Sequence, residues 1–406
     1  NHQDWADGLS EGDKQGAKGG FAIPENQSSK AATLKEMLAK YGEVARLGLA
    51  MGMAYEAGDV EDNFYGDGFN AELATRALEK LGKGSEKPFF LALGFGKPHL
   101  NWVSPKRYWD LYDRDEIPLA THPEPPQNGA TVGLHPSFEL RVRGGIPKLG
   151  PIPEDLQRTL MHAYLACVSY VDAQIGRVLA TLESTGLAEN TIVIVWSDHG
   201  YHLGDMGLWG KATNYELGTR VPLIVDMPNL PAASRGRKTD ALVELIDMYP
   251  TLCDLTDIET PNHVEGVSFG PVLAEPDRRW KEAAFSQFPS PALREWGAYP
   301  IRPAMRETYF GPLLEEVEDR IKEQMPESWD RDMFENDLMG YSVRTARYRM
   351  TDWRDSRNPN AIPVFVELFD HATDPKETIN IAEQNPVLVN VLRSRYRGKW
   401  NTGVSP

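Results

Sequence analysis

The sequence predicts an α/β protein with a large first domain and a smaller second domain. The chain has 406 residues, more than the roughly 250–300 that one hydrophobic core usually supports. Helical patterns alternate with short apolar, β-branched runs in the first part, which favours a mostly parallel central sheet flanked by helices. Strands with polar faces follow after residue 275. We therefore predict domains at residues 1–275 and 276–406, the second with an antiparallel sheet.

Composition sets further limits. Hydrophobic residues make up 41% of the chain and charged residues 25%, as in ordinary globular proteins. No run approaches the roughly 18 apolar residues of a membrane span, so we expect no membrane partner. A formal net charge of −16 argues against nucleic acid as a partner, because binding phosphates requires basic surface. An anionic substrate would need a local cationic pocket.

The first domain begins with helix followed by strand. Helical patterns cover residues 31–47 and 70–83, and the second leads into an apolar strand at 88–93. Residues 98–150 are rich in Pro, aromatic and acidic side chains, so we expect a long surface loop there. Long loops in compact domains are usually functional or disordered.

The clearest element is a long amphipathic helix. Apolar residues repeat at three- and four-residue spacing from Leu156 to Leu182, and Gly186 is placed to end the helix. A β-branched strand at 191–196 follows, then a strand at 221–226 and a helix at 242–255. In the second domain, strands are expected at 283–288, 340–352 and 363–369, with a helix at 313–324.

Two cysteines, Cys167 and Cys253, lie inside apolar helical patterns. We interpret them as buried small hydrophobic residues rather than as a disulfide. The chain opens with Asn1, so we expect that a preceding part was removed or is not included.

The sharpest candidate for chemistry is Asp198-His199, directly after the strand at 191–196. Ligands of open α/β sheets bind outside the carboxyl ends of the strands. An Asp at a strand end can also cap a helix, and an isolated Asp-His pair would favour that alternative. The neighbouring motifs change the balance.

Lys211 ends a loop punctuated by Gly207 and Gly210. A lysine there could be a solvated surface charge, or its ammonium could bind a sulfate or phosphate oxygen. Lys97 and His99 directly follow the strand at 88–93. A single histidine at such a position is more often structural, but two strands that present titratable residues at one edge are what an oxyanion site needs.

These residues belong to separated motifs that resemble the sulfatase family, in its iduronate-2-sulfatase-like branch. The resemblance covers the chain from about residue 60 to the end. It is carried by KPH at 97–99, YVD at 170–172, SDHGYHLGD at 197–205, GLWGKATN at 207–214, TRVPLI at 219–224, DMYPTL at 247–252, GYSVR at 340–344 and ELFD at 367–370.

The resemblance implies an alkaline-phosphatase-like fold and hydrolysis of a sulfate ester. It assigns Asp198 and His199 to a calcium site, where a carboxylate is the ligand that Ca²⁺ prefers and imidazole is unusual. It assigns Lys211 to holding the sulfate, and His99 to contacting it or protonating the leaving oxygen. A general acid there would contribute about 10²–10⁴-fold.

The family's nucleophile is missing from the chain. Sulfatases convert a Cys or Ser in a C/S-x-P-S-R motif to formylglycine, and neither cysteine lies in such a motif. We expect a separate N-terminal segment to supply it and the chain alone to be inactive. Two alternatives stay open: a non-catalytic relative that binds sulfated glycans, and a phosphodiester or phosphonate hydrolase.

The expected substrate is a sulfated polysaccharide or oligosaccharide, with uronate units among the candidates. Lys97, His202, Trp102 and Arg302 are the candidate binding residues. A wall residue is the favoured interpretation of His202, and Trp102 could equally pack its loop onto the domain. The resemblance further implies a periplasmic or secreted protein, or a lysosomal one in an animal.

Overall fold

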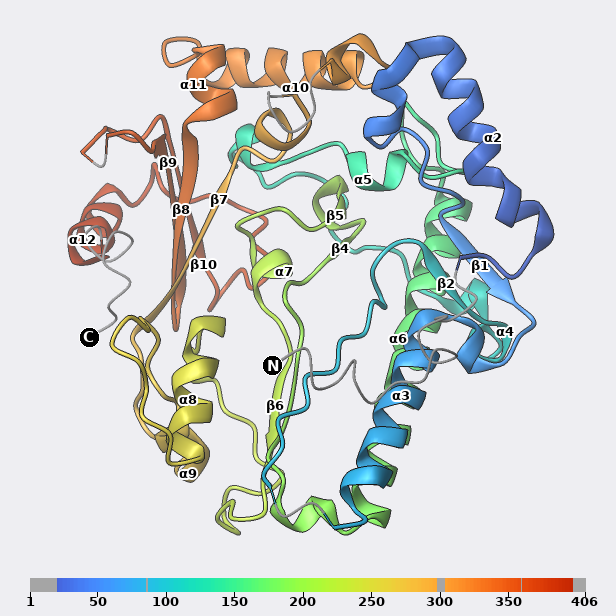
Figure 1. The fold of residues 1–406 in the computed structure, drawn as a ribbon. Helices are drawn as coiled ribbons and strands as arrows, with labels where there is room; N and C mark the ends of the chain where they lie inside the picture. Colours follow the sequence, from blue (N-terminus) through green and yellow to red (C-terminus); the bar gives the residue numbers. More distant parts are fainter. Residues whose placement is uncertain (1–19, 85–86, 298–303, 359, 397–406) are drawn as a thin grey trace. The chain divides into compact units, whose positions relative to one another are not determined.

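The computed structural model describes residues 20–84, 87–297, 304–358 and 360–396 (Figure 1). Two compact units are present. Unit 1 comprises residues 1–120 and 139–191, and unit 2 comprises residues 121–138 and 192–406. Compactness thus divides the chain elsewhere than at residue 275, and the boundary at 275 stays a prediction.

Unit 1 is built from helices around one parallel strand pair. β1 and β2 run parallel, with Tyr55 opposite Trp102. The short helix α5 (Phe138–Arg141) begins at the boundary between the units. The other elements of unit 1 are α2 (Pro24–Tyr41), β1 (Tyr55–Gly58), α3 (Gly66–Leu81), β2 (Trp102–Pro105), α4 (Lys106–Trp109) and α6 (Glu154–Ser184).

The long predicted helix is confirmed as α6, which forms the core of unit 1. Its fully buried side chains include Leu160, Cys167 and Tyr170, and it packs against α3 and β2. Gly186 takes the left-handed conformation just beyond its end, as expected for a helix stop. By length and composition α6 could cross a membrane, a test that a core helix also passes.

Unit 2 contains a four-stranded antiparallel sheet in the order β10-β9-β8-β7. This confirms the mixed α/β class with a C-terminal antiparallel sheet. The strands of unit 2 are β3 (Val193–Trp196), β4 (His202–Leu203), β5 (Trp209–Gly210), β6 (Leu223–Asp226), β7 (Ala283–Pro289), β8 (Leu338–Thr345), β9 (Tyr348–Asp355) and β10 (Phe365–Asp370). Its helices are α7 (Glu216–Thr219), α8 (Met248–Leu255), α9 (Gly270–Ala274), α10 (Gly311–Gln324), α11 (Arg331–Asn336) and α12 (Pro386–Tyr396).

Three expected strands need correction. Residues 88–93 form no strand, because none of the described residues pairs with them. The expected strand at 340–352 is the hairpin β8-β9, which apolar runs on either side of a turn resemble in sequence. β3 and β6 pair in antiparallel orientation, Val195 opposite Ile224, since no long crossover helix returns the chain to the start of β3.

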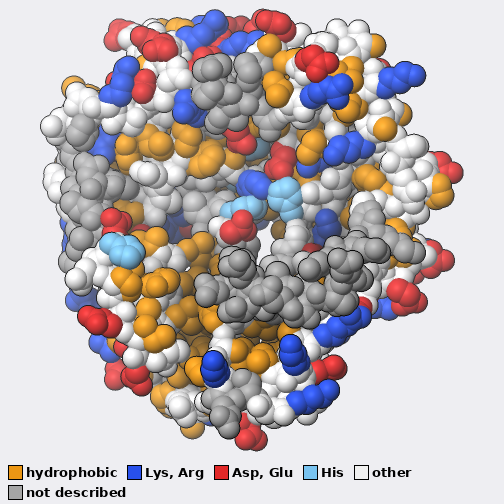
Figure 2. Space-filling model, in the orientation of Figure 1, with side chains coloured by type: hydrophobic (Ala, Val, Ile, Leu, Met, Phe, Trp, Pro, Cys, Tyr) orange, Lys and Arg blue, Asp and Glu red, His pale blue; other side chains and the backbone are white. Residues whose placement is uncertain are grey.

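The β3-β6 pair has two unlike faces. Ile194, Leu223 and Val225 pack against a cluster of Met248, Phe269 and Val272 on and beside α8 and α9. The opposite face leaves Ile224 61% exposed. Hydrophobic side chains also gather over α8 and α9 in Figure 2. Large apolar surface of this kind marks sites of contact with other polypeptide.

Candidate active site

The Asp198-His199 turn directly follows β3 in unit 2. The Asp198 carboxylate is 83% exposed and His199 is 33% exposed. The Nδ1–H of His199 donates to the Gly200 carbonyl at 2.7 Å, because a carbonyl oxygen can only accept. Its Nε2 then lies 3.7 Å from Asp198 Oδ2. The exposed carboxylate of Asp198 and the Nε2 atom of His199 therefore face each other.

The helix α7 supports this turn from behind. Gly200 N donates to the Gly218 carbonyl at 3.0 Å. A Cβ on Gly200 would lie 2.0 Å from the Leu217 carbonyl oxygen, so only glycine permits the approach. The placement of Asp198 and His199 thus depends on α7.

Lys211 follows the small β4-β5 hairpin, in which His202 pairs with Gly210. The hairpin brings the segment after His199 beside the segment that begins at Lys211. The side chain of His202 is fully buried, and its Nε2 lies 2.9 Å from Thr213 Oγ1. Burial lowers the pKa of His202 to about 3, with His135 contributing further. A neutral His202 therefore fixes the loop after Lys211.

The rest of the Lys211 loop is attached to the C-terminal sheet by buried groups. Asn214 donates to the carbonyls of Phe288 and Gly340 at 3.3 Å. Tyr215 Oη donates to Glu367 Oε1 at 2.7 Å. Burial raises the pKa of Glu367, while its hydrogen bonds oppose that rise. Antiparallel strands thereby hold a loop that comes much earlier in the sequence.

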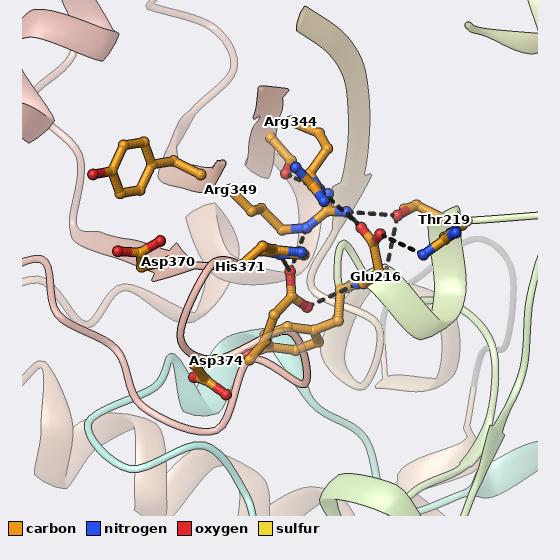
Figure 3. A network of polar contacts seen from close by, with 12 residues as sticks. Glu216, Thr219, Arg344, Arg349, Asp370, His371 and Asp374 are labelled. Atoms are coloured by element: carbon orange, nitrogen blue, oxygen red, sulfur yellow. Dashed lines mark hydrogen bonds and ion pairs between the residues drawn. The ribbon is translucent and has the colours of Figure 1, made fainter. Parts of the chain in front are cut away.

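The strongest of these attachments is a network around Arg349 (Figure 3). Arg349, 3% exposed, bonds Glu216 Oε2 at 2.5 Å and Glu377 Oε1 at 2.6 Å. Its Nη2 also donates to Thr219 Oγ1 at 3.1 Å. Burial would raise the pKa of Glu216, but Arg349 and Arg344 bring it below its ordinary value. The network fixes both ends of α7.

Glu216, His371 and Glu377 also place their ligand atoms within 4.8 Å of one another. Three such groups could hold a metal ion, but the guanidinium of Arg349 already lies among them and balances the two carboxylates. His371 Nε2 lies 2.8 Å from Glu377 Oε1. We therefore interpret the cluster as an ion-pair network rather than as a metal centre.

His99 and Lys97 belong to unit 1, on the loop before β2. Asp67, at the start of α3, accepts from Gly96 N at 2.7 Å and Lys97 N at 2.8 Å. Lys97 Nζ donates to the carbonyls of His99 and Asn101 at 3.2 and 2.6 Å. In the described structure Lys97 thus braces the His99 loop, and its expected substrate contact stays a prediction.

The His99 ring is half exposed and has an acceptor at each nitrogen. Nδ1 lies 2.6 Å from the Leu100 carbonyl. Nε2 lies 3.3 Å from Glu139 Oε1 at the start of α5. The imidazole is therefore oriented from both sides.

Two predicted substrate-binding residues are corrected by burial. Trp102 has no exposed surface, because its indole packs edge-on against Tyr164 and its Nε1–H donates to the Pro98 carbonyl at 2.8 Å. His202 is equally inaccessible. Neither side chain can stack on or contact a sugar. Arg302 lies outside the described residues.

Both cysteines are free and buried, which confirms that they form no disulfide. Burial raises the pKa of Cys167 to about 12. Because the thiolate is the reactive form of cysteine, Cys167 is unsuited to act as a nucleophile.

Sequence patterns did not indicate Asp67, Arg349, Glu377 or Glu139. Each acts on a site residue that is distant along the chain, and carboxylates and guanidinium groups are common on any surface. One signal could have identified Arg349: it is the second residue of β9, between Tyr348 and Met350. A charge in such a strand needs a buried partner.

The fold and the site define an α/β protein with hydrolase-like strand-end residues and an antiparallel C-terminal sheet. A family model described as Sulfatase matches residues 23–258. The chain belongs to the sulfatase family.

Relatives of established identity share about a third of the residues. The chain is 34% identical to mouse (Mus musculus) iduronate 2-sulfatase over 347 residues, which cover 73% of the chain and 57% of that protein. It is 33% identical to the human (Homo sapiens) enzyme with the same two coverages. The chain thus spans little more than half the length of these relatives.

Solved structures agree on the fold. A phosphonate monoester hydrolase from Silicibacter pomeroyi superposes with a TM-score of 0.63 at 23% identity, covering 94% of this chain and 70% of that one. A protein solved with its substrate D-glucosamine-2-N,6-O-disulfate gives a TM-score of 0.55 at 20% identity, covering 81% of this chain and 70% of that one. At these identities the likeness shows the fold alone.

Proposed function

We propose that this chain is part of a calcium-dependent sulfatase that hydrolyses a sulfate ester of a carbohydrate. The observation that carries the proposal is the arrangement in unit 2 of Asp198, His199 and Lys211. Asp198 and His199 follow β3 and Lys211 follows β5, and contacts to α7 and to buried groups hold their loops. The family to which the chain belongs and its similarity to iduronate 2-sulfatases support this reading of the arrangement.

The residues present fit a calcium site. The exposed carboxylate of Asp198 is a hard oxygen ligand, and it has no described ion pair besides its contact with His199. His199 Nε2 lies 3.7 Å from Oδ2 of this carboxylate, so the two side chains can contribute to one site. A bound calcium ion would supply positive charge for the sulfate oxygens.

Two residues would act on the substrate directly. Lys211 would hold a non-bridging sulfate oxygen through its ammonium, a point charge suited to tetrahedral anions. His99 would donate a proton to the ester oxygen as the sulfur–oxygen bond breaks, so that the sugar leaves as a neutral alcohol. These roles need no residue beyond those on the described loops.

We propose that a segment outside this chain supplies the formylglycine nucleophile and completes the sheet. Among the residues that the structure describes, the sheet of β3 and β6 has two strands, and its open face exposes Ile224. Phe90, within the extended run after α3, is 77% exposed. Unpaired strand edges beside apolar surface are the natural receptor for another strand.

For the substrate we propose sulfated saccharides that contain uronate units, because the relatives with the longest matches are named iduronate 2-sulfatases. We further propose a periplasmic or secreted location, or a lysosomal one in an animal, as the family resemblance implies.

The test uses the protein encoded with its upstream residues, matured to carry formylglycine. We expect it to hydrolyse 4-nitrocatechol sulfate and 2-O-sulfated uronate oligosaccharides, and to lose activity when calcium is chelated. Lys211→Met and His99→Gln should each lower kcat/KM by at least about 10²-fold. The present chain alone should be inactive.

Two outcomes would overturn the proposal. Binding of sulfated oligosaccharides without turnover by the matured protein would indicate a glycan-binding relative. Hydrolysis of phosphonate monoesters in preference to sulfate esters would indicate the phosphonate hydrolase alternative.

A further inference from the structure

The His99 ring faces a hydrogen-bond acceptor at both of its nitrogens. The Leu100 carbonyl lies 2.6 Å from Nδ1, and Glu139 Oε1 lies 3.3 Å from Nε2. We infer that Glu139 is a positioning residue that holds His99 in its protonated form, ready to act as the acid. The inference rests on the acid role of His99 in the proposed function.

The geometry favours one protonation state over the other. A carbonyl oxygen can only accept, so Nδ1 must carry a proton. If the ring were neutral, Nε2 would then present a lone pair to the Glu139 carboxylate, and the two would repel. In the imidazolium form both nitrogens donate, and the carboxylate balances the charge.

Other charged groups near the ring act in both directions. Lys97 Nζ contacts the backbone carbonyl of His99 and disfavours a second positive charge. Arg143 Nη2 lies 4.0 Å from the same Glu139 oxygen and competes for it. Asp67, whose two oxygens accept from the backbone N–H groups of residues 96 and 97, adds a negative charge on the same loop and favours the protonated ring. Among the described carboxylates, Glu139 is the one whose oxygen lies within 4.0 Å of a ring nitrogen of His99.

The length of the contact suits an acid that must release its proton. Charge-assisted hydrogen bonds between nitrogen and a carboxylate are usually about 2.7–2.9 Å long. At 3.3 Å the Nε2 proton is oriented by Glu139 but is not tightly held. When it passes to the ester oxygen, the ring becomes neutral and water can reprotonate it.

The test is an NMR titration of the present chain with labelled histidine, which needs no sulfatase activity. His99 is assigned among the nine histidines by the loss of its signal in His99→Gln. Glu139→Gln keeps the shape of the side chain but removes its charge. We expect this variant to lower the His99 titration midpoint by about 0.5–1 pH unit, a three- to tenfold change in the acid dissociation constant.

Two further variants separate positioning from general effects. Glu139→Asp keeps the charge and should restore most of the shift. Glu43→Gln removes an equally negative but exposed group of unit 1, paired with Arg46, and should leave the His99 midpoint unchanged. An unchanged midpoint in Glu139→Gln, or an equal shift in Glu43→Gln, would overturn the inference.

A measurement on the unmodified chain guards against a variant that fails to fold. Because His99 and Glu139 are partly exposed, salt should screen their attraction. The His99 midpoint should fall as the ionic strength rises from about 0.01 to about 1 M, because the Debye screening length then shortens from about 30 to about 3 Å. A midpoint that does not fall with salt would also overturn the inference. If the His99 midpoint shifts in Glu139→Gln as expected but the matured wild-type protein does not hydrolyse sulfate esters, the proposed function is contradicted and the role of Glu139 is not.

Discussion

The loop that carries Lys211 and the loop that carries His99 are held in different ways. The Lys211 loop, in unit 2, is attached through buried groups: His202, Tyr215 and Arg349 have almost no exposed surface. The His99 loop, in unit 1, is braced by Asp67 and Lys97, and its ring stays half exposed beside Glu139.

The difference suits the two proposed roles. A group that binds an anion must keep its position, and buried, fully paired contacts provide rigidity. A group that gives up a proton needs a neighbour that tunes its charge and access to solvent that restores the proton. Substitutions that disturb each loop should therefore differ in size and in pH dependence.

The largest effect is expected from Arg349→Met in unit 2. Removing the guanidinium leaves the buried Glu377 without its guanidinium partner and leaves Glu216 with Arg344. Losing one partner of a buried ion pair costs about 3–5 kcal/mol of unfolding free energy. Urea unfolding of the chain measures it. Arg320→Met, which removes an exposed pair with Glu316, should cost less than about 1 kcal/mol. Similar losses of unfolding free energy in both variants would contradict the interpretation that buried contacts of Arg349 hold the Lys211 loop.

The destabilisation caused by Arg349→Met should also depend on pH. The pKa of Glu216 is lowered in the folded chain, so its pairing stabilises above the ordinary glutamate value and is lost as pH falls through the folded value. In Arg349→Met that contribution is reduced, because Arg344 is then the remaining guanidinium that lowers the pKa of Glu216. The stability difference between the two proteins should therefore narrow as the pH falls below about 4.5.

The next effect is expected from His202→Gln at acid pH. The pKa of His202 in the folded chain, about 3, lies below the unfolded value of about 6.5. The unfolding free energy therefore decreases as the pH falls from the unfolded to the folded pKa. At pH 5 this loss is about 2 kcal/mol relative to pH 7. Gln cannot titrate, so the variant should show a flatter profile by urea unfolding. His263→Gln, at an exposed position, should retain the wild-type slope.

A smaller effect is expected from Asp67→Asn in unit 1. The carboxylate accepts two backbone N–H groups, and an amide offers only one oxygen. We expect a loss of about 1–2 kcal/mol, together with shifted amide signals of Gly96 and Lys97 in NMR spectra. Asp59→Asn, at an exposed position, is the control. Unmoved signals in Asp67→Asn would show that the loop does not depend on this residue.

The smallest effect is expected from Asp198→Asn. Its carboxylate is 83% exposed, so unfolding free energy without calcium should change by less than about 0.5 kcal/mol. Any stabilisation of the wild-type chain by added calcium should disappear in the variant. Asn214→Ala, which removes buried bonds to two carbonyls, should cost more. A large calcium-independent loss in Asp198→Asn would indicate a structural residue.

Periodic and local features were predictable from the sequence. The apolar spacing from Leu156 to Leu182 identified α6, and β-branched runs identified β3 and β6. The motifs around Asp198 and Lys211 identified the family, since several short patterns in one order are improbable by chance. Strand pairing was not predictable, because the orientation of β3 against β6 depends on the path of the chain between them.

By itself, then, the sequence determined the α/β class, the long core helix, the family and the candidate site residues. Only the tertiary structure decided which of them reach a surface: Trp102 and His202 are buried, whereas Asp198 is open. It also decided which partners hold them, namely Asp67, Glu139 and Arg349. The physical reason is that periodicity records local packing, while burial and charge pairing arise between residues that the fold brings together from distant parts of the chain.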